Sequence, residues 1–513
     1  MKKRLPVCLA LGVIVYGLLL GLLVTAERAA PQSGIRGLGD AAWFSLVTLA
    51  TVGYGDVYPV TPLGRWIGAL FVLFSVGVLA SVLGMAAAFL HGRVLPRLRL
   101  EALRRQRCYV FSQRNDLAEA LARDLLAREP RAHIVFCRAQ TASPSRRALC
   151  VPQDAVPTLQ ALRGPGEKTV FLTGEDIAEN LSAAQALRDA PVQVCCRGPE
   201  SDGLPGARFF DLPVCAARAY WQAYPLKSEE RVIVLAGGGE WGRAMLDQAV
   251  LVNCRLPFYA TEYHLLGDWA EYRGDHPGLL AVFAQEAGGE RDALIFHDGP
   301  WNAQPALLER ADRVIFCGDD PARNAALAAR LLRLFPLRGR VYAAAPAVPA
   351  PGVAFGRLEE ICTADLILRS ALDARARALH ELYCRRADQA QPWEELSPFL
   401  KDSNRASADH LLTKINLLLP GRDIRQITPE LCREAAARWA ALPDRESCRR
   451  NEHERWQRYY ALRNWRWGPE KDSVRRTHPC LTPYEKLSRE EREKDDSAWT
   501  QLALLGAEGE KNA

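Results

Sequence analysis

Two long uncharged runs near the amino terminus constrain the fold of this chain more than any other feature. They cover residues 5–24 and 66–90, and neither contains an acidic or basic residue. A helix rises about 1.5 Å per residue, so about 20 apolar residues match a hydrocarbon core about 30 Å thick. We therefore expect two membrane-spanning helices. A cleaved signal peptide is the alternative for the first run, but its apolar part is usually about 7–15 residues long and no second span should follow.

Basic residues beside the two runs predict their orientation. Cytoplasmic flanks of membrane spans carry an excess of Lys and Arg. We therefore expect a protein of the cell membrane, crossing the lipid bilayer twice, with both termini in the cytoplasm. The basic residues are Lys2, Lys3 and Arg4 before the first run and Arg93, Arg97, Arg99, Arg104 and Arg105 after the second.

The segment between the runs contains Thr51-Val52-Gly53-Tyr54-Gly55-Asp56, a pattern typical of an ion-coordinating strip. Stacked rings of backbone carbonyl oxygens can replace the water shell of a K⁺ ion. Turning successive carbonyls the same way needs backbone conformations that glycine adopts without steric cost. One chain supplies one strip and a ring needs four, so we expect a homotetramer. The predicted K⁺-coordinating carbonyls are those of Thr51, Val52, Gly53 and Tyr54.

Residues 39–49, just before this strip, are too few to span a bilayer and suit a re-entrant helix. Asp40 is the expected cap at its start. The partially negative carboxyl end of such a helix would point at the pore axis, where it stabilises a partly dehydrated cation.

Residues 48–59, followed by residues 61–65, resemble the pore region of two-span bacterial potassium channels. The likeness covers roughly residues 5–92. It implies an inner helix that bends at a glycine, for which Gly77 is the candidate hinge, although Ser75 lies at the usual spacing. Gly77 and Gly84 could equally be small residues that allow close helix packing.

The remaining part of the 513-residue chain is long enough for two or three further domains. Short apolar segments at 108–111, 134–137, 169–172 and 192–195 predict buried strands, and residues 116–128 predict a helix. Strands that alternate with helices indicate a parallel sheet covered on both faces.

The same architecture starts again with an expected strand at 231–236, followed by a glycine-rich turn and a helix at 243–251. Gly237, Gly239 and Gly242 form a G-x-G-x-x-G pattern, which lets a backbone approach a pyrophosphate at a helix amino terminus. Glu262, after an expected strand at 258–260, is placed to bind a ribose hydroxyl. The alternative is a glycine turn that only permits close packing.

Residues 171–176 with Asn180, and residues 316–320 with Asn324, resemble the acidic loop of domains that regulate potassium conductance, the nucleotide-fold lobes of many prokaryotic channels. The resemblance implies a regulatory nucleotide, NAD(H) or an adenine nucleotide, and a ring of eight lobes in the tetramer. Residues 112–117 of the first lobe contain no glycine, so we do not assign nucleotide binding to it.

Segments at 393–398, 401–410, 452–456, 464–468 and 478–487 together resemble the repeat domain of ryanodine receptors. Aromatic and basic side chains in this domain could hold a flat, anionic small molecule of the cytoplasm, such as a nucleotide-derived signal. The aromatic residues could instead form a helical core. The ligand candidates are Trp393, Arg405, Trp465, Tyr484 and Lys486.

Composition narrows the function classes. The net charge of +6 is small and dispersed, which argues against a nucleic-acid partner, and 14 scattered cysteines indicate reduced core thiols. A membrane-anchored NAD-dependent enzyme or redox sensor is the alternative to a ligand-gated potassium channel. The sequence offers no identifiable proton donor with a substrate pocket, and an enzyme would leave residues 51–56 unexplained, so we expect no enzyme.

The sequence therefore predicts a multidomain chain. An all-α, two-helix transmembrane pore domain with a re-entrant helix comes first, then two α/β Rossmann-like lobes, then a mainly α-helical domain. The expected boundaries are 1–100, 105–225, 229–350 and 376–505.

Overall fold

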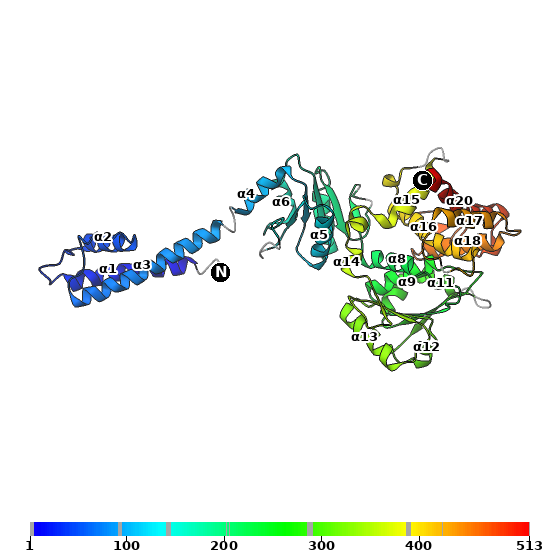
Figure 1. Ribbon diagram of the computed structural model, residues 1–513, viewed down its shortest axis with the longest axis horizontal. Coiled ribbons are helices and arrows are strands. Elements are labelled where there is room, and N and C mark those ends of the chain that lie inside the picture. Colours follow the sequence, from blue (N-terminus) through cyan, green and yellow to red (C-terminus); the bar gives the residue numbers. More distant parts are fainter. Residues whose placement is uncertain are drawn as a thin grey trace. The chain divides into compact units, whose positions relative to one another are not determined.

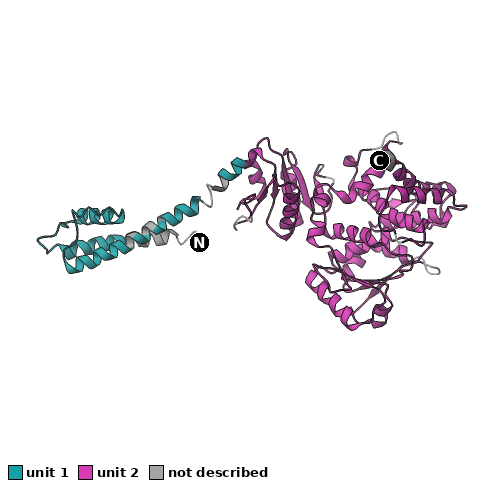
Figure 2. Cartoon of the chain, viewed as in Figure 1, with its two compact units in different colours: residues 1–102 teal, residues 103–513 magenta. Residues whose placement is uncertain are grey.

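The computed structural model describes residues 5–90, 95–139, 145–201, 203–204, 206–284, 291–385, 391–422 and 424–511. It divides into two compact units, residues 1–102 and 103–513 (Figure 2). Four of the basic residues used above to predict orientation lie outside the described residues: Lys2, Lys3, Arg4 and Arg93.

Helices make up the first unit (Figure 1). Both apolar runs fold as helices, and a shorter helix precedes the glycine-containing strip. Among the residues that the structure describes, no helix is both long and apolar enough to cross a membrane. The helices are α1 (Leu5–Glu27), α2 (Leu38–Leu49), α3 (Pro62–Phe89) and α4 (Leu95–Ala102).

The start of α2 differs from the expectation in one detail. Its cap is Gly37, and Asp40 lies inside the first turn. The Asp40 carboxylate accepts hydrogen bonds from the backbone N–H groups of Arg36 and Gly37 at 2.9 and 3.1 Å. Asp40 therefore still satisfies backbone donors at this end, from a position three residues further along the helix.

The second unit begins with a six-stranded parallel sheet, as the alternation of strands and helices predicted. Its strand order is β3-β2-β1-β4-β5-β6, the doubly wound order of Rossmann folds. Tyr109, Phe111, Phe136 and Phe171 fill its core. The strands are β1 (Cys108–Phe111), β2 (His133–Phe136), β3 (Ala148–Cys150), β4 (Lys168–Leu172), β5 (Gln193–Arg197) and β6 (Arg208–Phe210), and the helices are α5 (Asp116–Arg128), α6 (Ala155–Ala161), α7 (Ile177–Ala186) and α8 (Leu212–Ala223).

A second parallel sheet repeats this order as β12-β11-β10-β7-β8-β9. In both sheets the strand order reverses beside the first strand, where the crevice at the carboxyl ends can hold a ligand. The strands are β7 (Val232–Ala236), β8 (Glu262–Leu266), β9 (Ala293–His297), β10 (Arg313–Phe316), β11 (Arg340–Ala344) and β12 (Val353–Phe355), and the helices are α9 (Glu240–Val252), α10 (Ala270–Asp275), α11 (Pro277–Ala284), α12 (Pro305–Arg310), α13 (Pro321–Leu334) and α14 (Leu358–Ile361).

The carboxyl-terminal part is helical, apart from one short strand pair (Figure 1). Tyr459, Tyr460 and Trp465 share a buried cluster with Leu246 and Val250 of α9, so this part packs directly on the second lobe. Its elements are α15 (Ala374–Cys384), α16 (Pro398–Leu418), α17 (Pro429–Ala440), α18 (Glu446–Ala461), β13 (Arg466–Trp467), β14 (Thr477–His478), α19 (Arg489–Lys494) and α20 (Asp496–Lys511).

A buried arginine on α8 connects the lobes to these helices. Arg218 Nη1 lies 2.7 Å from Asp373 Oδ1, and Arg218 Nε lies 2.7 Å from Asp409 Oδ2 on α16. Burial by itself would raise the pKa of Asp373, but Arg218 and Arg405 lower it to about 2. Charges this deeply buried stay in place only when they are paired.

Replacing this arginine should therefore destabilise the second unit. Arg218→Met would leave Asp373 and Asp409 without their shared cation, which costs about 3–5 kcal/mol of unfolding free energy. Arg333→Met, at an exposed position on α13, should change stability by less than about 0.5 kcal/mol. Chemical denaturation of both variants measures the difference.

The same pair predicts a dependence on pH. The folded pKa of Asp373 is lowered, so its contribution to stability is fully present above the unfolded value of about 3.9 and is lost as the pH falls toward about 2. Denaturation of wild type and Asp373→Asn across this range tests the sign, and equal slopes for the two proteins would contradict it.

Candidate functional site

The glycine-containing strip of the first unit has an alternating backbone. Thr51, Gly53 and Gly55 have φ of 58°, 60° and 73°, while Val52 and Tyr54 between them keep negative φ. Alternation of this kind turns successive carbonyls toward one side, as carbonyl coordination of an ion requires. Glycine accepts positive φ freely, but a β-branched residue such as Thr51 does so only under local constraint.

Helix α2 supplies part of that constraint. The Val52 N–H donates to Val47 O at 3.0 Å, and the Trp43 indole N–H donates to Asp56 Oδ2 at 2.9 Å. The Trp43 and Tyr54 rings are stacked, with centroids 6.3 Å apart. These contacts hold both ends of the strip against α2.

A buried carboxylate joins the end of α1 to the start of α3. Glu27, at the end of α1, is 1% exposed and accepts hydrogen bonds from the backbone N–H groups of Val60 and Thr61 at 3.0 Å. It also accepts the Thr61 hydroxyl at 2.6 Å, and the same hydroxyl oxygen caps α3 through the N–H of Gly64. A Cβ on Gly64 would lie 1.9 Å from Glu27 Oε1, so a side chain at this position would have to displace the Glu27 carboxylate.

Gly77 lies inside α3, and a Cβ there would meet no atom within 4 Å. The same holds for Gly84, so contacts among the described residues of this chain do not require glycine at either position. The assignment of Gly77 as a hinge stays a prediction.

The glycine turn of the second lobe follows β7, as predicted, and opens α9. Gly237 has φ of 128°, which side chains disfavour, and a Cβ there would lie 2.4 Å from Gly318 N. A Cβ on Gly242 would lie 1.8 Å from Gly237 O. Glycine is therefore required at both positions by contacts within the protein itself.

The position that a phosphate would take at this helix end is occupied by a carboxylate of the same lobe. Asp319, in the loop after β10, accepts hydrogen bonds from the N–H groups of Glu240 and Trp241 at 3.2 and 3.0 Å. A Cβ on Gly239 would lie 1.9 Å from Asp319 Oδ2. Free N–H groups at a helix start favour an anion, and here the protein provides its own.

Glu262 does not lie at this turn, so its predicted role in ribose binding is wrong. Residues 258–260 form no strand, and Glu262 is instead the first residue of β8, paired in register with Val232 at the start of β7. Four residues at about 3.3 Å each separate it from the carboxyl end of the sheet. Glu262 instead contacts His264 Nε2 at 3.1 Å and Arg310 Nη2 at 3.2 Å.

Asp268 is the acidic residue that lies at the turn, two positions after β8. A Cβ on Gly238 would lie 1.6 Å from its carbonyl oxygen, and its side chain is exposed. The apolar pair Phe258-Tyr259 predicts a strand too early in the sequence, which makes Glu262 rather than Asp268 the acidic residue that follows it. The pattern of a strand followed by Gly267-Asp268 could have revealed it.

The corresponding crevice of the first lobe is closed by side chains. Ser112 Oγ accepts the Thr173 N–H at 2.9 Å, and Asn115 Nδ2 donates to Thr173 O at 2.9 Å. Asn115 Oδ1 also accepts the Ala118 N–H at 2.9 Å and so caps α5. These bonds use the donors that a phosphate would need.

The five candidates of the carboxyl-terminal domain do not form one site. Trp393 and Tyr484 are core residues, 4% and 3% exposed, and Lys486 is exposed. Arg405 lies within 3.0 Å of Asp373, Glu200 and Asp402, which makes it a structural ion-pair centre.

Trp465 lines a cavity of about 260 Å³, which we call the tryptophan cavity, while Arg405 lines a different cavity of about 480 Å³. Trp467 also lines it and is 62% exposed. Arg291, Arg450 and Arg466 contribute basic groups to its wall. Glu454 and Glu485 line the same cavity, and Arg450 Nη2 lies 2.9 Å from Glu485 Oε1. The structure therefore places aromatic, basic and acidic side chains around one cavity.

Comparison with known proteins assigns two segments. Residues 7–91 match the family described as ion channel, and residues 442–507 match the RyR domain family. Residues 7–91 thus resemble an ion channel domain, a kind of domain found in membrane proteins.

Two curated potassium channels each match a short segment of the chain. A voltage-gated potassium channel from Aeropyrum pernix is 43% identical over 58 residues, which are 11% of this chain and 20% of the relative. The calcium-gated potassium channel TvoK from Thermoplasma volcanium is 38% identical over 64 residues, 12% of this chain and 18% of the relative. The chain thus spans about a fifth of each relative's length.

Solved structures also resemble the chain. The GsuK channel bound to ADP shares 16% identity at a TM-score of 0.33, over 66% of this chain and 90% of that one. The GsuK channel bound to NAD shares 12% identity at a TM-score of 0.35, over 72% and 85%. The predicted likenesses to prokaryotic potassium channels and to RyR domains are confirmed.

The contact of Gly242 with the turn gives a testable consequence. Gly242→Ala forces a Cβ against Gly237 O and should destabilise the protein by about 1–3 kcal/mol. Gly274→Ala places its Cβ in open space at the end of α10, and should change stability by less than about 1 kcal/mol. Thermal unfolding of the two variants compares them, and equal losses would contradict the packing argument.

Proposed function

We propose that this chain is one subunit of a homotetrameric, potassium-selective channel that a small cytoplasmic ligand opens or closes. The observation that carries the proposal is the alternation of positive and negative φ along residues 51–55, within a domain of the ion channel family. Four such strips facing one axis supply the carbonyl rings that replace the hydration shell of K⁺.

In this proposal α1 and α3 are the membrane spans, α2 is the re-entrant helix, and both termini are cytoplasmic. The tetramer has fourfold symmetry around the strip. Because each chain has two doubly wound sheets, four chains contribute eight lobes, which form the regulatory ring. Gly77 is the proposed point at which α3 bends on opening.

The proposed nucleotide site is the glycine turn of the second lobe. Gly237, Gly239 and Gly242 bring the backbone close, and the start of α9 attracts a pyrophosphate. Asp268 takes the ribose-binding role in place of Glu262. An NAD(H) or adenine nucleotide must displace the Asp319 carboxylate, so binding is coupled to movement of the loop after β10.

The tryptophan cavity is a second proposed regulatory site. A flat anionic molecule would stack on Trp465 or Trp467 and meet the arginines of the wall. Arg405 joins this domain to Glu200 of the first lobe and to Asp373. A ligand shifts the gate only by its difference in affinity between the open and closed arrangements.

Ion flux tests the channel proposal directly. Purified protein in liposomes should pass K⁺ and exclude Na⁺. Gly53→Ala should abolish this selectivity, because Gly53 has φ of 60° and alanine resists that conformation. Gly39→Ala, inside α2 with open space around its Cβ, is the matched control and should conduct as wild type does. Equal flux of the two ions through wild-type protein would overturn the proposal.

Asp319 gives a separate test of the nucleotide site. Asp319→Asn keeps an oxygen acceptor for the start of α9 but removes the charge that opposes a pyrophosphate, so NADH or ADP should bind about tenfold more tightly. Asp320→Asn is the matched control, because Asp320 caps α13 instead. Calorimetric titration measures both. Weaker binding by Asp319→Asn, or the same change in both variants, would contradict displacement.

A further inference from the structure

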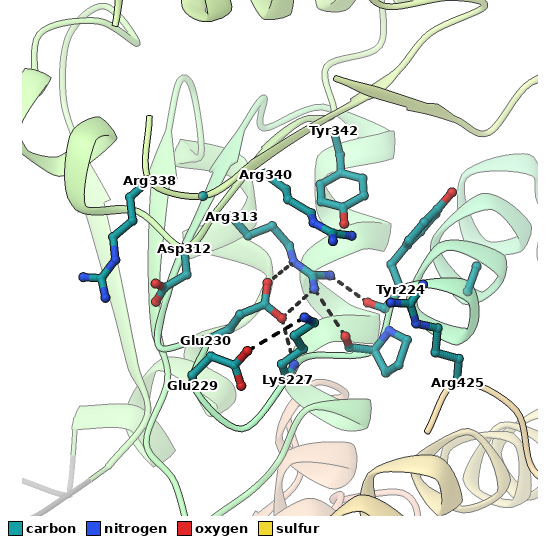
Figure 3. A pocket seen from close by; sticks show the side chains of 13 residues that line it. Tyr224, Lys227, Glu229, Glu230, Asp312, Arg313, Arg338, Arg340, Tyr342 and Arg425 are labelled. Carbon is teal, nitrogen blue, oxygen red and sulfur yellow. Dashed lines mark hydrogen bonds and ion pairs between the residues drawn. The ribbon is translucent and has the colours of Figure 1, made fainter. Parts of the chain in front are cut away.

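A cavity lined by basic side chains lies at the opposite edge of the second sheet from the glycine turn. We call it the arginine cavity, and its volume is about 250 Å³ (Figure 3). Arg313 and Arg340 are the first residues of β10 and β11, whereas Gly237 follows the carboxyl end of β7. The two sites are therefore separated by the length of the strands.

The floor of the arginine cavity is a neutral ion pair. Arg313 lies 3.0 and 2.7 Å from the two carboxylate oxygens of Glu230, and it donates to Tyr224 O at 2.7 Å (Figure 3). Tyr342 packs over its guanidinium at 5.2 Å. The charge of Arg313 is thus used within the protein.

The walls carry an excess of positive charge. Five basic and three acidic side chains line the cavity, among them Lys227, Arg338, Arg340 and Arg425. The Asp312 carboxylate accepts hydrogen bonds from the backbone N–H groups of Arg231 and Val232, at 2.7 and 3.0 Å. Within the described part of the chain, neither Arg338 nor Arg340 has a side-chain ion pair or hydrogen bond.

The backbone holds these two arginines in place. They flank Gly339, where a Cβ would lie 2.2 Å from Asp312 O and 2.4 Å from Ala311 O. Close contact of this turn with the strand start fixes where both side chains begin. Arginines that extend from a fixed backbone beside a cavity are suited to bind phosphate or carboxylate groups.

The cavity size selects among anions. Sites for drug-sized ligands measure about 300–1,000 Å³, and this one falls below that range. This size suits a small ligand. Lys227 Nζ lies 3.9 Å from Glu229 Oε1, and a ligand that replaces this carboxylate at Lys227 and also meets Arg340 needs two anionic groups. We propose that the arginine cavity binds a small polyanion of the diphosphate class.

Calorimetric titration of the purified full-length chain with inorganic pyrophosphate tests this proposal. Wild-type protein should bind it, and orthophosphate should bind more weakly because it carries a single phosphate group. The double variant Arg338→Gln/Arg340→Gln should bind pyrophosphate at least about tenfold more weakly, the loss expected when charge-assisted hydrogen bonds are removed. Lys227→Gln should weaken binding independently.

The matched control is Arg323→Gln/Arg333→Gln, which removes the same charge from exposed positions of α13 outside the cavity. It should bind as wild type does. Equal weakening in both double variants, or no binding by wild-type protein, would overturn the proposal. Arg338 and Arg340 are exposed, so their replacement leaves the folded core unchanged. The assay measures no ion flux, so neither outcome bears on the channel proposal.

Discussion

Buried guanidinium groups determine how the second unit holds together. Arg218 bridges Asp373 and Asp409, and Arg458 lies 2.7 Å from Asp292, with both of these side chains 2% exposed or less. Removing such charges from water is unfavourable unless each finds its counter-ion in one fixed geometry. The pairs join segments more than 150 residues apart, so the helices of the carboxyl-terminal part cannot pack in another register without leaving charges unpaired.

Much of the fold followed from local patterns. Residues 116–128 form α5 with the bounds that the sequence pattern predicted, and both parallel sheets start where short apolar segments indicated. The second strand of the second lobe was misplaced, because Phe258-Tyr259 is locally as strand-like as residues 262–266. Hydrophobic periodicity does not distinguish two adjacent short apolar segments, and the sheet register that selects between them is a long-range property.

The sites were predictable to different extents. A strip of carbonyls depends on backbone conformation, which the glycine positions reveal, so residues 51–56 could be recognised directly. Asp319 and Gly239 lie 80 positions apart, and their contact depends on the strand order that places β10 beside β7. The arginine cavity depends on another adjacency, since Arg313 and Arg340 lie side by side because β10 pairs with β11. Neither the contact of Asp319 with Gly239 nor the pairing of Arg313 with Arg340 can be predicted from sequence spacing alone.

The two sheets share one strand order but differ in what fills the crevice beside the first strand. In the first crevice the neutral side chains of Asn115 and Ser112 form hydrogen bonds to the Thr173 backbone. In the second, the Asp319 carboxylate, on the loop after β10, accepts the N–H of Trp241. Ser112 and Asn115 carry no charge, so their hydrogen bonds depend little on the ionic composition of the solution. The Asp319 carboxylate, in contrast, competes with any other anion for the N–H groups at the start of α9. The two crevices therefore differ in how readily an anion can enter them.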